Sequence, residues 1–156
     1  MYLSIKKNIM ENNTLKQVEQ EMKKRGLLKE QEIMDTNPFV EMISKLVFSR
    51  DQTHIYHWQS QSLSEHKALN KYYDGVPVIA DGLVESYQGK YGILKGYKSY
   101  QMADYTTSDE VIGFLKGLSE DIENLRQSIQ ESYIQNQIDT AVELIQSTIY
   151  KLENLK

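Results

Sequence analysis

The stretch HWQSQSLSEHKALNKYYDGVPVIADGLVESYQG, residues 57–89, decides how this chain is interpreted. It holds two of the three histidines, the only tryptophan and several acidic residues. Its segment Ser62-Leu63-Ser64-Glu65 is a capping box, in which a serine and a glutamate satisfy the first free amides of a helix. We therefore expect a helix that runs from this box toward Tyr87 and ends before Gly89. Its polar residues form either a metal site or the solvated face of an ordinary bundle helix.

Three more helices are predicted around this one. Asn37-Pro38 places a capping residue before a proline at the first helical position, so a helix should run from there to about Gln59. A second capping box at residues 107–110 opens a helix that fades near Gln130, and the last helix covers roughly 134–154. The apolar residues that define these helices are Phe39, Ile43, Leu46 and Val47, then Val111, Ile112, Leu115 and Leu118, then Ile138, Ala141, Val142, Leu144, Ile145, Ile149 and Leu152.

The order of these helices predicts an all-α fold. Two antiparallel pairs joined by a long connection at 89–106 make a four-helix bundle with one crossover, the ferritin-like topology among the possible bundles. Residues 36–156 form this bundle domain, and residues 1–35 form an N-terminal arm that is partly helical. The arm carries nearly balanced charges.

Composition narrows the classes of function. The chain has 156 residues, of which 40% are hydrophobic, and a formal net charge of -4. Such a chain fits one domain with a real core and has no general attraction to nucleic acid or anionic membranes. It contains no cysteine, which excludes disulfides and thiolate metal sites. It shows neither a signal peptide nor an apolar run of about 18 residues, so we expect a soluble cytoplasmic protein without membrane contact.

Four polar positions share one face of the predicted helix at 62–87. At about 100° per residue, positions 66, 70, 81 and 85 fall within roughly one third of the helix circumference. His66 and Asp81 are nevertheless about 22 Å apart along the axis, too far to bind one ion within a single chain. Two copies lying antiparallel across a two-fold axis would bring His66 of one chain to Asp81 and Glu85 of the other.

This arrangement predicts a metal site shared between two subunits. His57, at the end of the preceding helix, is the second candidate imidazole, and His54 is a possible extra ligand one turn earlier. Imidazole with carboxylates suits iron(II), zinc or manganese, and open positions would admit oxygen or peroxide. The sequence gives no support for nucleophilic catalysis or for a phosphate-binding loop, so we assign no other catalytic or cofactor-binding residue.

At these residues the chain resembles the Dps proteins of the ferritin-like superfamily, whose pattern is a His-Trp pair followed by a helix bearing His, Asp, Asp and Glu. His57-Trp58, His66, Asp81 and Glu85 match it, and the spacings from His66 to Asp81 and from Asp81 to Glu85 are those of the family. The resemblance implies a homo-oligomer built from two-fold dimers, which in the family form a hollow shell. It also implies a shared ferroxidase centre that oxidises iron(II) with peroxide or oxygen and stores the product, with His57, His66, Asp81 and Glu85 as metal ligands.

The segment ending in Val84-Glu85-Ser86-Tyr87-Gln88-Gly89 is also similar to uncharacterised Dps-like proteins encoded by tailed phages, which implies the host cytoplasm or the virion as location. The chain departs from the Dps pattern at Asn70, where the family has its first Asp, and in a loop after Trp58 that is three residues shorter. We expect Gly75-Val76-Pro77 to interrupt and kink the helix. A catalytically silent structural or interaction protein, possibly from a phage, is therefore the alternative.

Two further expectations concern Trp58 and the N-terminal arm. Trp58 should serve burial, either in the core or in a dimer interface, because a large aromatic side chain is usually spent on packing. Protection of DNA by a shell would require basic arms, which the nearly neutral residues 1–35 do not provide. Whether the long connection holds a short helix, as it does in the Dps family, is left open by the sequence.

Overall fold

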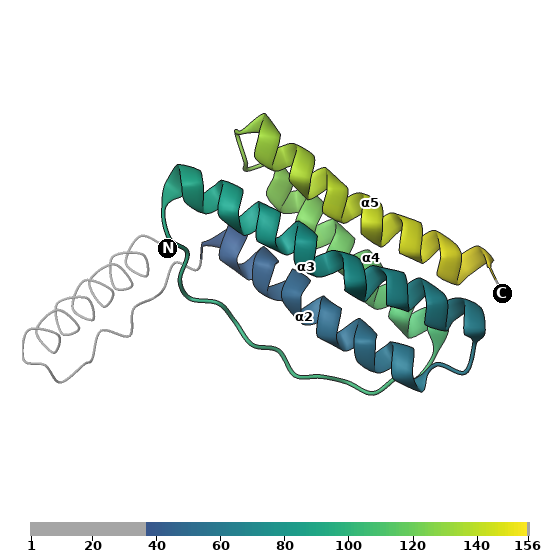
Figure 1. Ribbon diagram of the computed structural model, residues 1–156. Coiled ribbons are helices and arrows are strands. Elements are labelled where there is room, and N and C mark those ends of the chain that lie inside the picture. Colours follow the sequence, from purple (N-terminus) through teal and green to yellow (C-terminus); the bar gives the residue numbers. More distant parts are fainter. Residues whose placement is uncertain (1–36, 156) are drawn as a thin grey trace, which may run out of the picture. The chain divides into compact units, whose positions relative to one another are not determined.

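The computed structural model describes residues 37–155, and the predicted arm at residues 1–35 lies outside this range. Within it the chain forms four helices and no strand: α2 (Pro38–Gln59), α3 (Leu63–Tyr91), α4 (Ser108–Arg126) and α5 (Ser132–Asn154) (Figure 1). The prediction of an all-α bundle is confirmed at this level. No helix in the described part is both long and apolar enough to cross a membrane.

The helix starts follow from local chemistry, as predicted. The Asn37 side chain accepts a hydrogen bond from the Phe39 amide at 3.0 Å, and Pro38 occupies the first helical position of α2. Ser62 and Thr107 cap α3 and α4 in the same way, accepting from the amides of Glu65 and Glu110. Each cap satisfies an amide that has no partner inside its helix.

The predicted end of α3 is wrong, because the helix continues through Gly89 to Tyr91. Gly92 is the residue that stops it, with a φ of 92° that side-chain-bearing residues rarely adopt. The expected interruption at Gly75-Val76-Pro77 is also absent, since α3 runs through Pro77 as one helix. Pro77 is exposed, so water can hydrate the carbonyl oxygen that the missing proline amide leaves free.

Gly75 has a packing role beside this proline. A Cβ atom at position 75 would lie 3.0 Å from Cδ2 of Leu144 on α5. The absence of a side chain therefore lets α3 and α5 approach closely at this level of the bundle.

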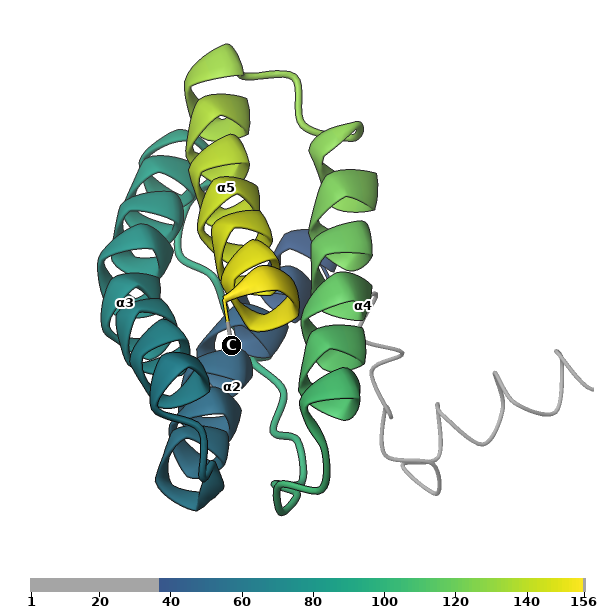
Figure 2. The same ribbon diagram turned by 90° about the vertical axis from the view of Figure 1, so that its right-hand side faces the viewer.

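The four helices form a ring in which α2 and α5 each lie between α3 and α4 (Figure 2). Short turns join α2 to α3 and α4 to α5, so each of these pairs is antiparallel. The connection from α3 to α4 returns along the length of α2, so α3 and α4 run in the same direction (Figure 1). The bundle therefore has two hairpins and one long crossover.

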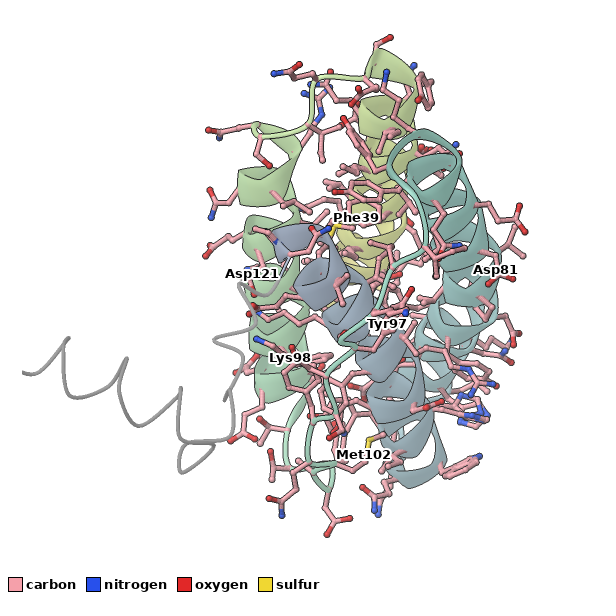
Figure 3. All side chains as sticks on the ribbon, turned by 90° about the vertical axis from the view of Figure 1, so that its left-hand side faces the viewer. Phe39, Asp81, Tyr97, Lys98, Met102 and Asp121 are labelled. Carbon is pink, nitrogen blue, oxygen red and sulfur yellow. The ribbon has the colours of Figure 1, made fainter. Side chains whose placement is uncertain are left out.

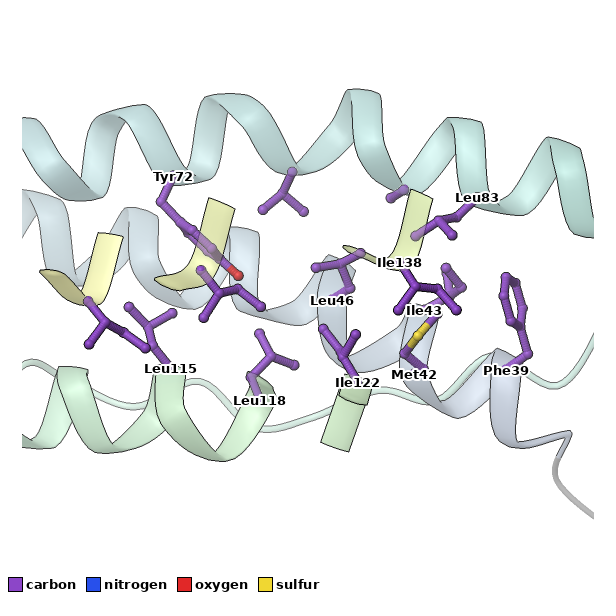
Figure 4. Close-up of a cluster of buried hydrophobic side chains, with 14 of the residues drawn as sticks. Phe39, Met42, Ile43, Leu46, Tyr72, Leu83, Leu115, Leu118, Ile122 and Ile138 are labelled. Atoms are coloured by element: carbon purple, nitrogen blue, oxygen red, sulfur yellow. The ribbon is translucent and has the colours of Figure 1, made fainter. Parts of the chain in front are cut away.

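Side chains from all four helices fill the interior (Figure 4). The largest fully buried apolar ones are Phe39, Ile43, Leu46, Leu69, Tyr72, Leu83, Leu115, Ile122, Ile134, Ile138 and Ile145. Val47, predicted to face the core, is instead 47% exposed and lies in a groove beside Tyr97 and Met102 of the connection. The buried hydroxyl of Tyr72 has a hydrogen-bond partner in the Ser49 hydroxyl, 2.7 Å away.

The connection at 92–107 contains no helix and is held against α2 by side chains. The buried amide of Gln52 donates to the Ala103 carbonyl at 2.7 Å and accepts from the Ala103 amide at 2.8 Å. Ser44 accepts from the Lys98 amide at 2.9 Å. These bonds replace the backbone partners that a helix would supply.

An ion-pair network ties the same connection to two helices. Lys98 lies 3.1 Å from Glu41, and Lys45 on α2 reaches both Glu41 and Asp121 of α4. The hydrogen bond from Lys98 is the largest of the effects that lower the pKa of the Glu41 carboxyl. Figure 3 shows Lys98 and Asp121 on this side of the bundle.

Two glycine substitutions should shift stability in opposite directions. Gly113 lies inside α4 with open space around the position of a Cβ, so Gly113→Ala should raise the free energy of unfolding by about 0.5–1 kcal/mol. Gly92→Ala should lower it by about 1 kcal/mol, because alanine is strained at positive φ. Urea unfolding of both variants measures this, and a stabilising Gly92→Ala would contradict the structure.

Gln52→Leu should loosen the connection. The variant leaves the Ala103 amide and carbonyl without partners. We therefore expect the free energy of unfolding to fall by about 1–3 kcal/mol and hydrogen exchange at the Ala103 amide to become faster. Gln101→Leu, at an exposed position of the same segment, is the matched control and should change neither quantity. Unchanged exchange at Ala103 in Gln52→Leu would rule out the role of this amide pair.

Candidate metal centre

His57 and His66 meet at one end of the bundle, where α2 ends and α3 begins. The three-residue turn between Gln59 and Leu63 brings them together, and Ser62 caps the new helix. His57 is buried, with 7% of its surface exposed, whereas His66 is half-buried. Both histidines lie on the helices predicted for them, and the structure brings their rings into contact.

Each of these histidines donates a hydrogen bond to the backbone of the other. Nδ1 of His57 lies 2.8 Å from the carbonyl oxygen of His66, and Nδ1 of His66 lies 2.9 Å from the carbonyl oxygen of His57. A carbonyl oxygen only accepts, so both Nδ1 atoms must carry the hydrogen. A neutral ring that carries its hydrogen on Nδ1 has its free lone pair on Nε2, the state in which an imidazole can bind a metal.

The two rings are stacked, with centroids 3.6 Å apart and planes inclined by 24°. The lone pair of an imidazole nitrogen lies in its ring plane, and planes this close to parallel do not converge near the rings. The stacked pair therefore cannot hold one ion with both Nε2 atoms. For both Nε2 atoms to bind one ion, one ring must turn. Without such a turn, each ring can bind an ion of its own.

Aromatic side chains surround the histidine pair. His54 stacks on Tyr73 at a centroid distance of 4.0 Å and lies 4.3 Å from Trp58, and Tyr73 also contacts His57 edge-on at 5.2 Å. All three histidines of the chain thus gather at one end of α2 and α3. Trp58 is 68% exposed, so its predicted place in the core is wrong, whereas a place in an interface stays a prediction.

Asp81 and Glu85 lie one turn apart on the outward side of α3, and both are exposed (Figure 3, Asp81). Among residues 37–155 no cationic side chain lies within ion-pair distance of either carboxylate. The axial separation of about 22 Å from His66 follows from the helix rise, because α3 is one uninterrupted helix. Within the described part of one chain, no three His, Asp or Glu side chains are grouped to hold a metal ion.

Asn70, which stands where the Dps pattern has an aspartate, points along α3. Its amide nitrogen donates to Oδ2 of Asp74 at 2.5 Å. Asp74 is itself exposed, one turn further along the helix. A carboxylate is therefore present one turn beyond position 70, although it lies eight residues, or about 12 Å, from His66 along the axis.

Glu65 is a buried carboxylate whose role the sequence reasoning missed. Its Oε2 accepts from the Ser60 hydroxyl at 2.7 Å and from the Tyr105 hydroxyl at 3.1 Å, while Oε1 has no partner among the described residues. Burial, and then the bond to Glu65, raise the pKa of Tyr105. The capping box is thus only half formed, because Glu65 turns inward and holds the connection. The signal available in the sequence is its spacing: Glu65 precedes the apolar Ala68 and Leu69 by three and four residues, which places it on the inward face of the helix.

The chain belongs to the DUF5856 family, a family of unknown function, whose model matches residues 57–152. This range begins at His57 and includes His66, Asp81 and Glu85. No curated protein matches the chain significantly, and neither does any solved structure.

The hydrogen bonds predict the tautomers of the two rings. In ¹⁵N-resolved spectra of the neutral side chains, His57 and His66 should carry the hydrogen on Nδ1. His54 is the internal comparison, since its ring makes no hydrogen bond within the described chain. The hydrogen on Nε2 in His57 and His66 would show that the reciprocal bonds are not formed.

Proposed function

We propose that this protein is a ferritin-like, Dps-like metal-binding protein that binds iron(II) at a site shared between two subunits. His57 and His66 of one subunit face Asp81 and Glu85 of the other, in a homo-oligomer built from two-fold dimers. The bound iron is oxidised for storage or detoxification, which makes ferroxidase activity the expected chemistry. The pairing of both Nδ1 atoms with carbonyl oxygens is the observation that carries the proposal.

The histidine geometry supports metal binding because of what lies behind each ring. Histidine ligands almost always donate their second ring N–H to a carboxylate, a carbonyl oxygen or water, which fixes the tautomer and orients the ring. Here both rings have this support from the backbone. A metal-binding histidine needs one ring nitrogen with a free lone pair, and because both Nδ1 atoms are engaged here, that nitrogen is Nε2.

The carboxylates supply the charge that a divalent cation needs. Asp81 and Glu85 are four residues apart on a helix, where like charges repel and destabilise the helix slightly. Nothing in the described chain neutralises them. Two carboxylates and imidazole nitrogens form a ligand set for iron(II), with Mn²⁺ and Zn²⁺ as alternative ions.

The topology also supports the ferritin-like assignment. One long crossover between two antiparallel hairpins is the connectivity of ferritin-like bundles. In oxidation by peroxide, each iron(II) gives up one electron and each peroxide accepts two, so two iron(II) ions are consumed per peroxide. The stacked rings suit this stoichiometry, because each Nε2 can serve a separate ion.

A catalytically silent structural or interaction protein is the second candidate. The connection at 92–107 contains no helix, unlike that of the Dps family, and the aspartate of the Dps pattern is replaced by Asn70. A bundle with these departures would assemble without turning iron over.

Anaerobic titration with iron(II), followed by addition of peroxide, tests the proposed function. The wild-type protein should bind iron saturably and oxidise it rapidly, and His66→Ala with Glu85→Ala should abolish both properties, because the variant lacks a ligand from each half of the site. The rate of ferric absorbance increase measures oxidation, and equilibrium dialysis measures binding.

The matched control is Glu120→Ala with Asn124→Ala, which removes two exposed polar side chains from α4, a helix that carries none of the proposed ligands. It should bind and oxidise iron as the wild type does. Iron binding in the wild type no stronger than in the ligand variant would reject the metal site and favour the silent bundle. Binding without oxidation would reject the ferroxidase reaction alone.

A further inference from the structure

The outward face of α3 carries a straight stripe of six exposed residues, here called the α3 seam: Lys67, Lys71, Asp74, Val78, Asp81 and Glu85. Their spacing alternates between four and three residues. An alternation of this kind keeps residues on one line along a helix and is the spacing by which two helices pair along their length. The seam lies outside the bundle core, since α3 packs on α2 and α5 with its other side.

Charge along the α3 seam is sorted by sign. The two lysines lie in the first half, Asp81 and Glu85 lie in the second half, and Asp74 and Val78 separate them. None of these two lysines and two carboxylates forms an ion pair within the described residues. A helix with one basic half and one acidic half is complementary to an antiparallel copy of itself.

We propose that the α3 seam binds the α3 seam of a second copy of this chain in antiparallel orientation, around a two-fold axis at position 76. In this register Lys67 faces Glu85 of the second copy, and Lys71 faces its Asp81. Asp74 faces Val78 of the second copy. The spacing of the seam is symmetrical about position 76, so every member meets another member of the seam.

Apolar and small residues fit the same register. Val78 is 76% exposed, and the two copies of Val78 would lie about 6 Å apart along the axis at the centre of the interface. Leu63, which is 68% exposed, precedes the seam by four residues, and Gly89 follows it by four, so they face each other. Glycine weakens a helix, and nothing in its own chain requires one at position 89, since a Cβ there would meet no atom within 4 Å. The close approach of Leu63 of the second copy explains why position 89 is glycine and why an apolar side chain is exposed at position 63.

This register also orders the shared metal site, and only this step rests on the proposed function. Along the helix axis, His66 is at the height of position 86 of the second copy. Glu85 of that copy is therefore offset in height by about 1.5 Å and Asp81 by about 7.5 Å. Glu85 is therefore the carboxylate closest in height to His66. Lys67 and the metal ion would share this carboxylate.

A charge swap tests the seam in metal-free protein kept in EDTA. Lys67→Glu with Lys71→Glu makes both halves acidic, and Asp81→Lys with Glu85→Lys makes both halves basic. The wild type should dimerise, whereas each variant alone should dissociate with a dissociation constant raised roughly a hundredfold or more. An equimolar mixture of the two variants should form a heterodimer, which analytical ultracentrifugation detects.

The mixture is also the control for folding, because only folded variants can restore each other. Circular dichroism of each variant alone checks its helix content. A wild-type protein that stays monomeric at the highest concentration reached overturns the proposal, and so do variants that dimerise as the wild type does or fail to associate when mixed. Iron binding is measured separately. A wild-type dimer that binds no iron rejects the metal site and keeps the seam, whereas a Lys67→Glu, Lys71→Glu variant that still dimerises and binds iron rejects the seam and keeps the shared metal site.

Discussion

The antiparallel pairing of α2 with α3 is the constraint on which the rest of the site depends, and two reciprocal hydrogen bonds close its end. Because His57 and His66 each donate to the other's carbonyl oxygen, the end of one helix is tied to the first turn of the next. The same bonds fix both tautomers and stack the rings. One local interaction thus joins the fold of the hairpin to the chemistry that its histidines can perform.

The crossover depends on polar residues that the bundle buries along α2. Ser44, Ser49, Gln52 and Thr53 are all at most 4% exposed, so the inward side of α2 is not a simple apolar stripe. Ser44 and Gln52 bind the backbone of the connection, and Ser49 pairs with the Tyr72 hydroxyl. Buried polar groups of this kind are stable only when each finds a partner, so these residues of α2 help to specify the path of the connection, together with Glu65 of α3.

Local sequence chemistry predicted the helix starts and failed at features set by packing. Asn37-Pro38, Ser62 and Thr107 act within one turn, so a single sequence identifies them. The end of α3 could not be predicted in the same way, because Gly89 and Gly92 are both able to stop a helix and only Gly92 takes a positive φ. The proximity of His57 and His66 follows from the short turn, but the inward turn of Glu65 depends on Tyr105, a residue of the connection that lies 40 positions away in the sequence.

The exposed face of α3 joins assembly and chemistry through its charges. At each end of an antiparallel pair, two lysines and two carboxylates already balance, so a divalent ion bound by both carboxylates would leave an excess of two positive charges. A metal ion at the shared site must therefore displace the lysines or share the oxygens of Asp81 and Glu85 with them. Metal binding and dimer formation then affect each other's free energy by the same amount, as linkage requires. The α3 seam is the part of the molecule where the proposed metal site and the proposed interface cannot be changed independently.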